Sequence, residues 1–119
     1  MAVADWETVR EIAGVLPGAE ESTTYGKPAF RVKGKLFAWV SPDDAAEDAL
    51  ALRVDPGELP LLLETAPDRY FQTPHYHGHP ILLVRLDRIA RQELGERIED
   101  SWLLRAPKRL VDAFVAAGD

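Results

Sequence analysis

The feature that most constrains the fold of this chain is a pair of strand-like segments on either side of Gly34. Phe30 and Val32 alternate with basic residues before the glycine, and apolar and aromatic residues fill positions 36–40 after it. Alternation of this kind is typical of β-strands, and a glycine between two strands permits a tight turn. Because strands joined by a short turn pair antiparallel, the sequence predicts an antiparallel hairpin within a β region that spans residues 20–40.

The same pattern assigns the side chains of the second strand to its two faces. In a regular strand, successive side chains point to opposite sides of the sheet. We therefore expect one face of this strand to carry Leu36, Ala38 and Val40. Phe37 and Trp39 should lie on the opposite face.

Helical and loop patterns flank this β region. Apolar residues recur at helical spacing over residues 6–16, where Asp5 is in position to cap the first turn and Pro17 ends the helix. Residues 41–48 form an acidic, polar stretch that is expected to be a loop. Residues 49–54 are predicted to form another strand.

The middle of the chain contains a strong helix-start pattern. A second helix is expected to begin at Asp55, with Pro56 at its first position and Glu58 reaching back in a capping box. A loop rich in proline, glycine and histidine should follow over residues 67–79. This loop leads into an apolar strand over residues 81–86.

The C-terminal third is predicted to be helical. Leu94, Ile98 and Trp102 lie four residues apart, and Pro107 opens a last amphipathic helix. Strands grouped between helices favour an α+β fold of two layers, an antiparallel sheet with helices packed on one face. No repeat or linker interrupts the pattern, so residues 1–119 are expected to form a single domain.

Charge and composition restrict the possible functions. The chain of 119 residues has a formal net charge of −6, which argues against strong DNA binding, because dedicated nucleic-acid binders usually have a strongly basic domain. The absence of cysteine excludes disulfides, thiolate catalysis and cysteine-based metal sites. No apolar run approaches the roughly 18 residues of a membrane span, and the N-terminal residues lack a signal-peptide pattern. We therefore expect a cytoplasmic protein that does not bind membranes.

Four stretches together resemble the MmcQ/YjbR family of small bacterial proteins. They are LPGAEES at 16–22, YGKPAFRVKGKLFAWV at 25–40, YFQTPHYHGHPILLVRLD at 70–87 and ELGERIEDSWLLRAPKRL at 93–110. The resemblance implies a two-layer α+β fold similar to that of secretion chaperones. Proteins of this family are commonly labelled DNA-binding, so the resemblance makes nucleic acid an expected partner. The acidic charge of this chain departs from the basic character often described for its relatives.

Basic residues interleaved with aromatic residues make the hairpin a candidate binding surface. If Arg31, Lys33 and Lys35 share one strand face, they form a positive stripe that can contact phosphates while an aromatic ring stacks on a base. A half-buried hairpin that shows its polar face to water explains the same pattern. The complete cluster consists of Lys27, Arg31, Lys33 and Lys35.

A second basic cluster lies near the C-terminus, next to Trp102. The helix that opens at Pro107 leaves backbone N–H groups free for an anion, and cations at such a position are unfavourable without one. In the alternative interpretation, Trp102 is a core residue and Arg105 pairs with Glu99 or Asp100. The cluster consists of Arg105, Lys108 and Arg109.

Three histidines alternate just before an apolar run: His75, His77 and His79. On an extended segment such side chains share one face, and two imidazoles can ligate one zinc ion. The sequence offers no third ligand at motif spacing, and Gly78 and Pro80 disfavour a regular strand. We therefore expect no metal here, and the histidines together with Trp102 are candidates for lining a ligand cleft.

From these observations we infer a non-enzymatic, cytoplasmic binding module that needs no cofactor. Its expected activity is weak, salt-dependent contact with nucleic acid, without base readout because no recognition-helix motif is present. The expected phosphate contacts are Lys27, Arg31, Lys33, Lys35, Lys108 and Arg109. The first alternative is a module that binds a protein or small ligand in a cleft near the His-rich loop, and the second is a metal-dependent enzyme at the three histidines. The sequence leaves the ligand and the oligomeric state open.

Overall fold

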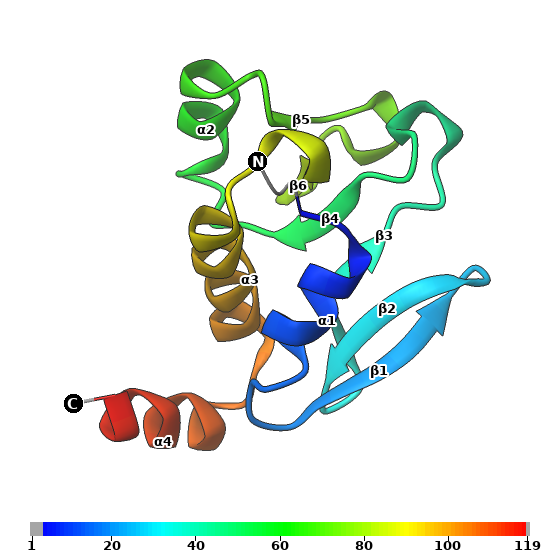
Figure 1. Ribbon diagram of the computed structural model, residues 1–119. Helices are drawn as coiled ribbons and strands as arrows, with labels where there is room; N and C mark the ends of the chain where they lie inside the picture. Colours follow the sequence, from blue (N-terminus) through cyan, green and yellow to red (C-terminus); the bar gives the residue numbers. More distant parts are fainter. Residues whose placement is uncertain (1–3, 119) are drawn as a thin grey trace.

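The protein is built on a six-stranded antiparallel sheet, as a computed structural model that describes residues 4–118 shows (Figure 1). Across the sheet the strands follow the order β1-β2-β3-β4-β6-β5. The strands are β1 (Ala19–Thr24), β2 (Lys27–Val32), β3 (Lys35–Val40), β4 (Leu50–Arg53), β5 (Tyr70–Phe71) and β6 (Ile81–Val84). The helices are α1 (Trp6–Ala13), α2 (Leu59–Thr65), α3 (Arg91–Arg105) and α4 (Lys108–Gly118), and short 3₁₀ helices cover Asp44–Ala46, Pro74–Tyr76 and Leu86–Arg88.

α1 begins where the sequence predicts and ends earlier. The Asp5 carboxylate accepts a hydrogen bond from the Thr8 backbone N–H at 3.0 Å, and the Asp5 N–H donates to the Thr8 hydroxyl at 3.2 Å. This reciprocal pair satisfies N–H groups that the start of a helix leaves free. The helix ends at Ala13, short of position 16, with Gly14 as its C-cap; the Leu16 N–H then bonds the Ala13 carbonyl at 3.2 Å, a tighter turn that leaves the α-helical pattern.

The hairpin is present, but a β-bulge corrects the expected faces of β3. Phe30 pairs with Ala38. The next residue, Arg31, pairs with Leu36, and Phe37 is therefore left over as the bulged residue. Phe37 is fully buried in the same cluster as Ala38, beneath the helices. The prediction that Phe37 would lie opposite Ala38 is wrong, because the bulge interrupts the alternation of side chains.

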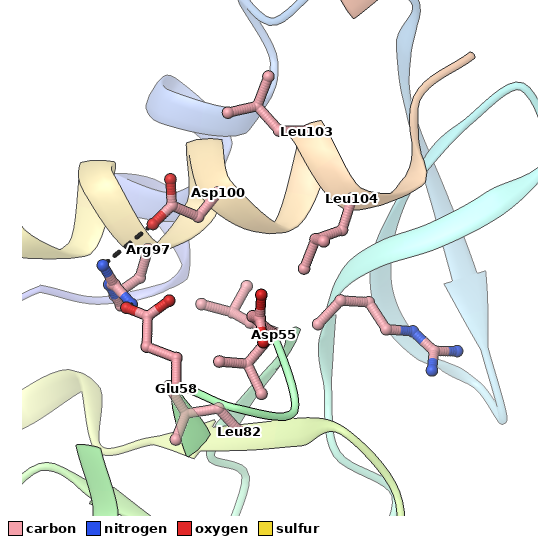
Figure 2. A pocket seen from close by; sticks show the side chains of 10 residues that line it. Asp55, Glu58, Leu82, Arg97, Asp100, Leu103 and Leu104 are labelled. Atoms are coloured by element: carbon pink, nitrogen blue, oxygen red, sulfur yellow. Dashed lines mark hydrogen bonds and ion pairs between the residues drawn. The ribbon is translucent and has the colours of Figure 1, made fainter. Parts of the chain in front are cut away.

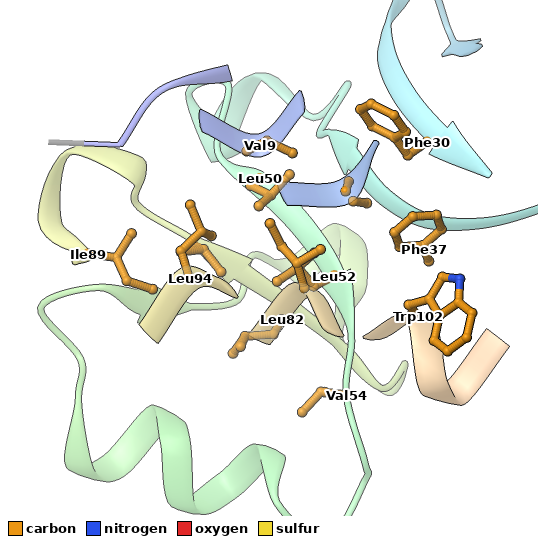
Figure 3. Packing of buried hydrophobic residues seen from close by; sticks show 14 of the residues in the cluster. Val9, Phe30, Phe37, Leu50, Leu52, Val54, Leu82, Ile89, Leu94 and Trp102 are labelled. Carbon is orange, nitrogen blue, oxygen red and sulfur yellow. The ribbon is translucent and has the colours of Figure 1, made fainter. Parts of the chain in front are cut away.

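Buried side chains form two clusters, one on each face of the sheet. The larger cluster lies under the helices (Figure 3) and includes Val9, Phe30, Phe37, Leu50, Leu52, Leu82, Leu94, Ile98 and Trp102. The smaller cluster lies on the opposite face, where two 3₁₀ helices contribute Ala46 and Tyr76, and the strands contribute Trp39, Ala51 and Leu83. Apolar residues of all four α-helices named above pack against the larger cluster, so the helices occupy one face as predicted.

α2 starts later than the sequence pattern indicates. The Asp55 carboxylate accepts from the Gly57 N–H at 2.7 Å, and the Asp55 carbonyl accepts from Glu58 and Leu59, so a turn precedes the helix. The Glu58 carboxylate turns away and bonds the Arg97 guanidinium at 2.8 Å. The predicted capping box is therefore wrong, because Glu58 has a charged partner on α3.

A side chain of α3 joins β3 to β4 where the two strands separate. Ala38 and Leu52 are the last residue pair of the two strands at this end. Beyond them, the buried Ser101 hydroxyl accepts from the Arg53 N–H at 2.8 Å and donates to the Phe37 carbonyl. One hydroxyl therefore satisfies two buried backbone groups that the bulged sheet leaves unpaired.

These observations confirm the predicted α+β fold with an antiparallel sheet and helices on one face. The expectation that residues 67–79 form only a loop is wrong in one detail, because β5 forms within this segment. Over residues 4–118, no helix combines the length and the apolar character that crossing a membrane requires.

Candidate functional site

The structure separates Lys27 from the other predicted phosphate contacts. Lys27 pairs with Thr24 at the turn between β1 and β2, and its ammonium forms an ion pair with Asp48. Lys35 pairs with Val32 at the other end of β2. Because a strand rises about 3.3 Å per residue, most of the length of β2 lies between Lys27 and Lys35.

Arg31 and Lys35 lie on opposite faces of the sheet. Directly paired residues point to the same side, and Arg31 pairs with Leu36, which packs against the smaller cluster. Lys35 pairs with Val32, which belongs to the larger cluster. The Arg31 guanidinium also donates to the Gly34 carbonyl at 3.1 Å within its own hairpin. The single-face stripe expected from the sequence is therefore not formed.

Four of the predicted basic residues lie near one end of the molecule, which we call the basic end. They are Lys33 and Lys35 around the β2–β3 turn, and Lys108 and Arg109 at the start of α4 (Figure 1). The two segments meet at Gly18, which lies between Leu110 of α4 and Val32 at the end of β2. A Cβ atom added to Gly18 would lie 3.0 Å from Leu110 Cδ1 and 3.6 Å from Val32 Cγ2. Lys108 also pairs with Asp112 at 2.6 Å, so its charge is partly neutralised.

The histidines lie on the surface around a short 3₁₀ helix. His75, His77 and His79 are all exposed, and the His75 ring packs edge-on against Tyr76 with 4.7 Å between centroids. The buried Tyr76 hydroxyl bonds the Ser41 hydroxyl at 2.6 Å. In the described part of the chain, no three His, Asp or Glu residues are grouped so that they could hold a metal ion.

Trp102, a predicted cleft residue, lies in the core. Its side chain is fully buried, its Nε1 donates to the Pro17 carbonyl at 3.0 Å, and its ring centroid lies 5.0 Å from that of Phe114. A ligand cannot reach this ring without displacing α4. The structure thus agrees with the core interpretation of Trp102 rather than the cleft interpretation.

A cavity of about 260 Å³ lies between the end of β4 and α3 (Figure 2). Its floor is apolar and is formed by Leu52, Val54, Leu82 and Leu103. Leu104 is 50% exposed, which places it at the mouth of the cavity. No residue that the sequence singled out as a site residue lines this cavity.

Charged side chains form the rim of the cavity. Arg97 Nη1 lies 2.8 Å from Glu58 Oε1, and Arg97 Nη2 lies 3.0 Å from Asp100 Oδ2, while Asp55 extends the rim (Figure 2). Burial opposes the charge of Arg97, but the hydrogen bond to Glu58 and the nearby carboxylates outweigh burial and raise the pKa of its guanidinium. The rim is therefore fixed before any ligand arrives. The spacing of Arg97 and Asp100, three residues apart on one helix, was the available sequence signal.

Two further arginines, of which Arg53 lines the cavity, have no ion-pair partner within residues 4–118. Arg53, at the end of β4, has its Cζ 5.6 Å from the centroid of the Trp39 ring. Arg105 ends α3, and within residues 4–118 it forms an ion pair neither with Glu99 nor with Asp100, which is bonded to Arg97. The sequence signal for Arg53 is a charged residue inside the otherwise apolar stretch 49–54.

A separate ionic cluster joins α3 to β5. Glu93 Oε2 lies 2.6 Å from Arg69 Nε and also accepts from the Tyr70 hydroxyl. Burial alone raises the pKa of Glu93, but the hydrogen bonds from Arg69 and Tyr70 outweigh it and hold this pKa below its ordinary value. The cluster is structural, since it fixes the start of α3 against the edge of the sheet.

This cluster predicts how stability depends on pH. A carboxyl whose pKa is lowered on folding contributes stability above its unfolded pKa of about 4.3, and this contribution is lost as the pH falls through the folded pKa. We expect Glu93→Gln to flatten the fall in unfolding free energy below about pH 5. Urea unfolding from pH 3 to pH 7 measures this, with Glu96→Gln on the exposed side of the same helix as the control. Equal curves for the two variants would contradict the prediction.

The chain is similar to a known protein family in sequence and in fold. A family model described as YjbR matches residues 15–104. Similar proteins include the uncharacterized proteins Rv2570 of Mycobacterium tuberculosis (strain H37Rv) and Mb2600 of Mycobacterium bovis. Each is 36% identical to this chain over an alignment of 129 residues, gaps included, and the alignment covers 96% of this chain and 98% of the relative. The crystal structure of the Deinococcus radiodurans protein DR2400, with a family-model domain DUF419, has a TM-score of 0.72 at 24% identity, covering 86% of this chain and 78% of that one. All residues that line the cavity lie within the matched stretch, whereas Lys108 and Arg109 lie outside it.

Proposed function

This chain belongs to the YjbR family, and we propose that it is a non-enzymatic binding module whose ligand occupies the cavity between β4 and α3. The observation that carries the proposal is the open apolar floor of this cavity beneath a rim already fixed by ion pairs. Sites for small molecules are typically concave, mostly apolar and preformed, with a few oriented polar groups. The lack of cysteine fits a reducing compartment, so we place this binding in the cytoplasm.

The ligand that fits best is a small molecule with an apolar body and a hydroxyl or ammonium group. The volume of about 260 Å³ lies just below the usual range of roughly 300–1,000 Å³, so the body has few carbon atoms. Of the rim carboxylates, those of Glu58 and Asp100 are bonded to Arg97. The Asp55 carboxylate has one oxygen bonded to the Gly57 N–H, and its other oxygen can accept from a ligand.

Short-chain alcohols and amines test this proposal. Hexanol and hexylamine should bind saturably and shift the methyl NMR signals of Leu52, Leu82 and Leu104. Leu104→Asp should weaken binding about tenfold, because it places a charge at the apolar mouth. Leu61→Asp is the matched control, since Leu61 is 58% exposed on α2 and does not line the cavity. The proposal fails if no methyl signal moves, or if both variants bind equally well.

A second candidate function is weak, sequence-nonspecific contact with nucleic acid at the basic end. The observation that favours it is the meeting of the β2–β3 turn with the start of α4 at Gly18. Among the described residues, Lys33, Lys35 and Arg109 take part in no ion pair, so their charges are available to phosphates. Lys27 does not belong to this surface because it pairs with Asp48 at the far end of β2.

The salt dependence of binding tests the second candidate. Each phosphate contact on a single strand contributes about −0.7 to the slope of log K against log salt concentration. Lys33→Glu should therefore make the slope shallower by about 0.7, whereas Lys27→Glu, the same charge change at the far end, should leave it unchanged. Fluorescence anisotropy with a labelled single-stranded oligonucleotide across a salt series measures both. Binding that is insensitive to salt, or equally affected by the two changes, contradicts this candidate.

A further inference from the structure

Arg53 and Arg105 carry buried nitrogen atoms that have no hydrogen-bond partner. Within residues 4–118, the Nε atoms of these two arginines are the buried side-chain nitrogen or oxygen atoms left without one. Neither guanidinium takes part in an ion pair or a side-chain hydrogen bond there, although Arg97 nearby has both. Buried polar atoms in folded proteins nearly always have a protein, water or ion partner, so this pair requires an explanation.

The folding of α3 onto the sheet brings these two arginines together. The Ser101 hydroxyl accepts from the Arg53 backbone N–H at 2.8 Å, which fixes the end of β4 against α3. Arg105 lies four residues after Ser101 and therefore on the same face of the helix, one turn further along. The Arg53 guanidinium lies over the Trp39 ring at 5.6 Å. The two residues are thus neighbours where β3 and β4 separate, close enough for their like charges to repel.

The fold accounts for one positive charge here but not for the second. Arg105 lies in the last turn of α3, where the free carbonyl groups of a helix favour a cation. The Trp39 ring attracts the charge of Arg53, yet a ring face does not supply the in-plane acceptor that an Nε–H group requires. Burial, and then repulsion from Arg105, lower the pKa of Arg53. Two like charges are therefore held together with donors that nothing in the described chain accepts.

We propose that Arg53 and Arg105 form a binding site for an oxyanion, a phosphate, sulfate or carboxylate group that accepts hydrogen bonds from both guanidinium groups. The planar guanidinium group matches the geometry of such oxyanions and can donate two parallel hydrogen bonds. A bound oxyanion accepts from the terminal Nη groups, which are not buried, and replaces the repulsion between the cations by attraction to a shared anion. The site shares Arg53 with the lining of the cavity, and it adds an anion to the ligand proposed for that cavity.

NMR of the arginine Nε–Hε groups in the full-length chain tests this site directly. Titration with inorganic phosphate should shift the signals of Arg53 and Arg105 together and to saturation, whereas chloride at the same ionic strength should not. Arg53→Lys and Arg105→Lys assign the signals, keep the charge, and should each weaken phosphate binding about tenfold by removing the planar donor pair. Arg88→Lys, at an exposed arginine, is the matched control and should bind phosphate like the original protein.

Two further titrations identify the source of the oxyanion. If a single-stranded oligonucleotide displaces phosphate with a steep salt dependence, the site holds a nucleic-acid backbone. If a mononucleotide binds as tightly as the oligonucleotide, the site holds the phosphate group of a small molecule. The proposal is overturned if phosphate causes no saturable shift of these two signals, or if Arg88→Lys weakens binding as much as the other two changes. Arg105 does not line the cavity, and phosphate rather than hexanol is the probe, so failure of the cavity proposal is distinguishable from failure of this one.

Discussion

Replacing Trp102 by alanine should lower the free energy of unfolding by about 3–5 kcal/mol, the largest loss that we expect from a single change in this protein. The side chain is fully buried in the cluster under the helices, so its removal creates a cavity. The change also leaves the Pro17 carbonyl without its donor and removes the ring that packs against Phe114. Because Phe114 lies on α4, the loss should extend to the attachment of this helix.

Urea unfolding followed by circular dichroism measures the loss. Trp102→Phe is the matched control, since it keeps an aromatic ring but not the N–H donor, and it should cost clearly less than alanine. Hydrogen exchange should become faster in α4 of the alanine variant before it does in β4. A loss below about 1 kcal/mol would show that Trp102 is a surface residue, as in the cleft interpretation.

Ser101→Ala should cost about 2–4 kcal/mol, an unusually large effect for the removal of one oxygen atom. The Ser101 hydroxyl is fully buried and serves both the Arg53 N–H and the Phe37 carbonyl. Each backbone group left unpaired in the interior costs about 1–3 kcal/mol. The expected cost is therefore set by the two partners and not by the small volume of the lost atom.

Two measurements examine this prediction. Urea unfolding gives the change in stability, and amide hydrogen exchange should show loss of protection at Arg53 in particular. Ser22→Ala is the control, because the Ser22 hydroxyl makes a long, exposed contact of 3.4 Å to the Thr23 carbonyl. If both serine variants lose the same small amount, Ser101 does not act as a bridge between the strands.

Local sequence signals predicted most of the secondary structure. The cap at Asp5, the turn at Gly34 and the four-residue spacing from Leu94 to Trp102 depend on residues close together in the chain, and the structure confirms each of them. The bulge at Phe37 was not predictable in this way. It depends on the register between two strands and on a serine 64 residues away that satisfies the freed carbonyl.

The candidate site was harder to predict because its residues come from distant segments. Arg97 is close to Asp100 in sequence, but its second partner, Glu58, lies 39 residues earlier. Arg53 and Arg105 become neighbours only when α3 lies across the end of β4. The three histidines are close together in the sequence, but they lie on an exposed surface and do not line the cavity.

The Ser101 bridge also determines how the sheet can bend. Peptide groups in a strand ladder hold two strands in a fixed register, whereas a serine hydroxyl is carried on one rotatable bond with staggered minima. Beyond the Ala38–Leu52 pair, the end of β3 that leads to the basic end is coupled to β4 through this hydroxyl. The three residue pairs between β3 and β4 keep their register, so a change of the Ser101 rotamer would release only the separated ends beyond them, where Phe37 and Arg53 lie.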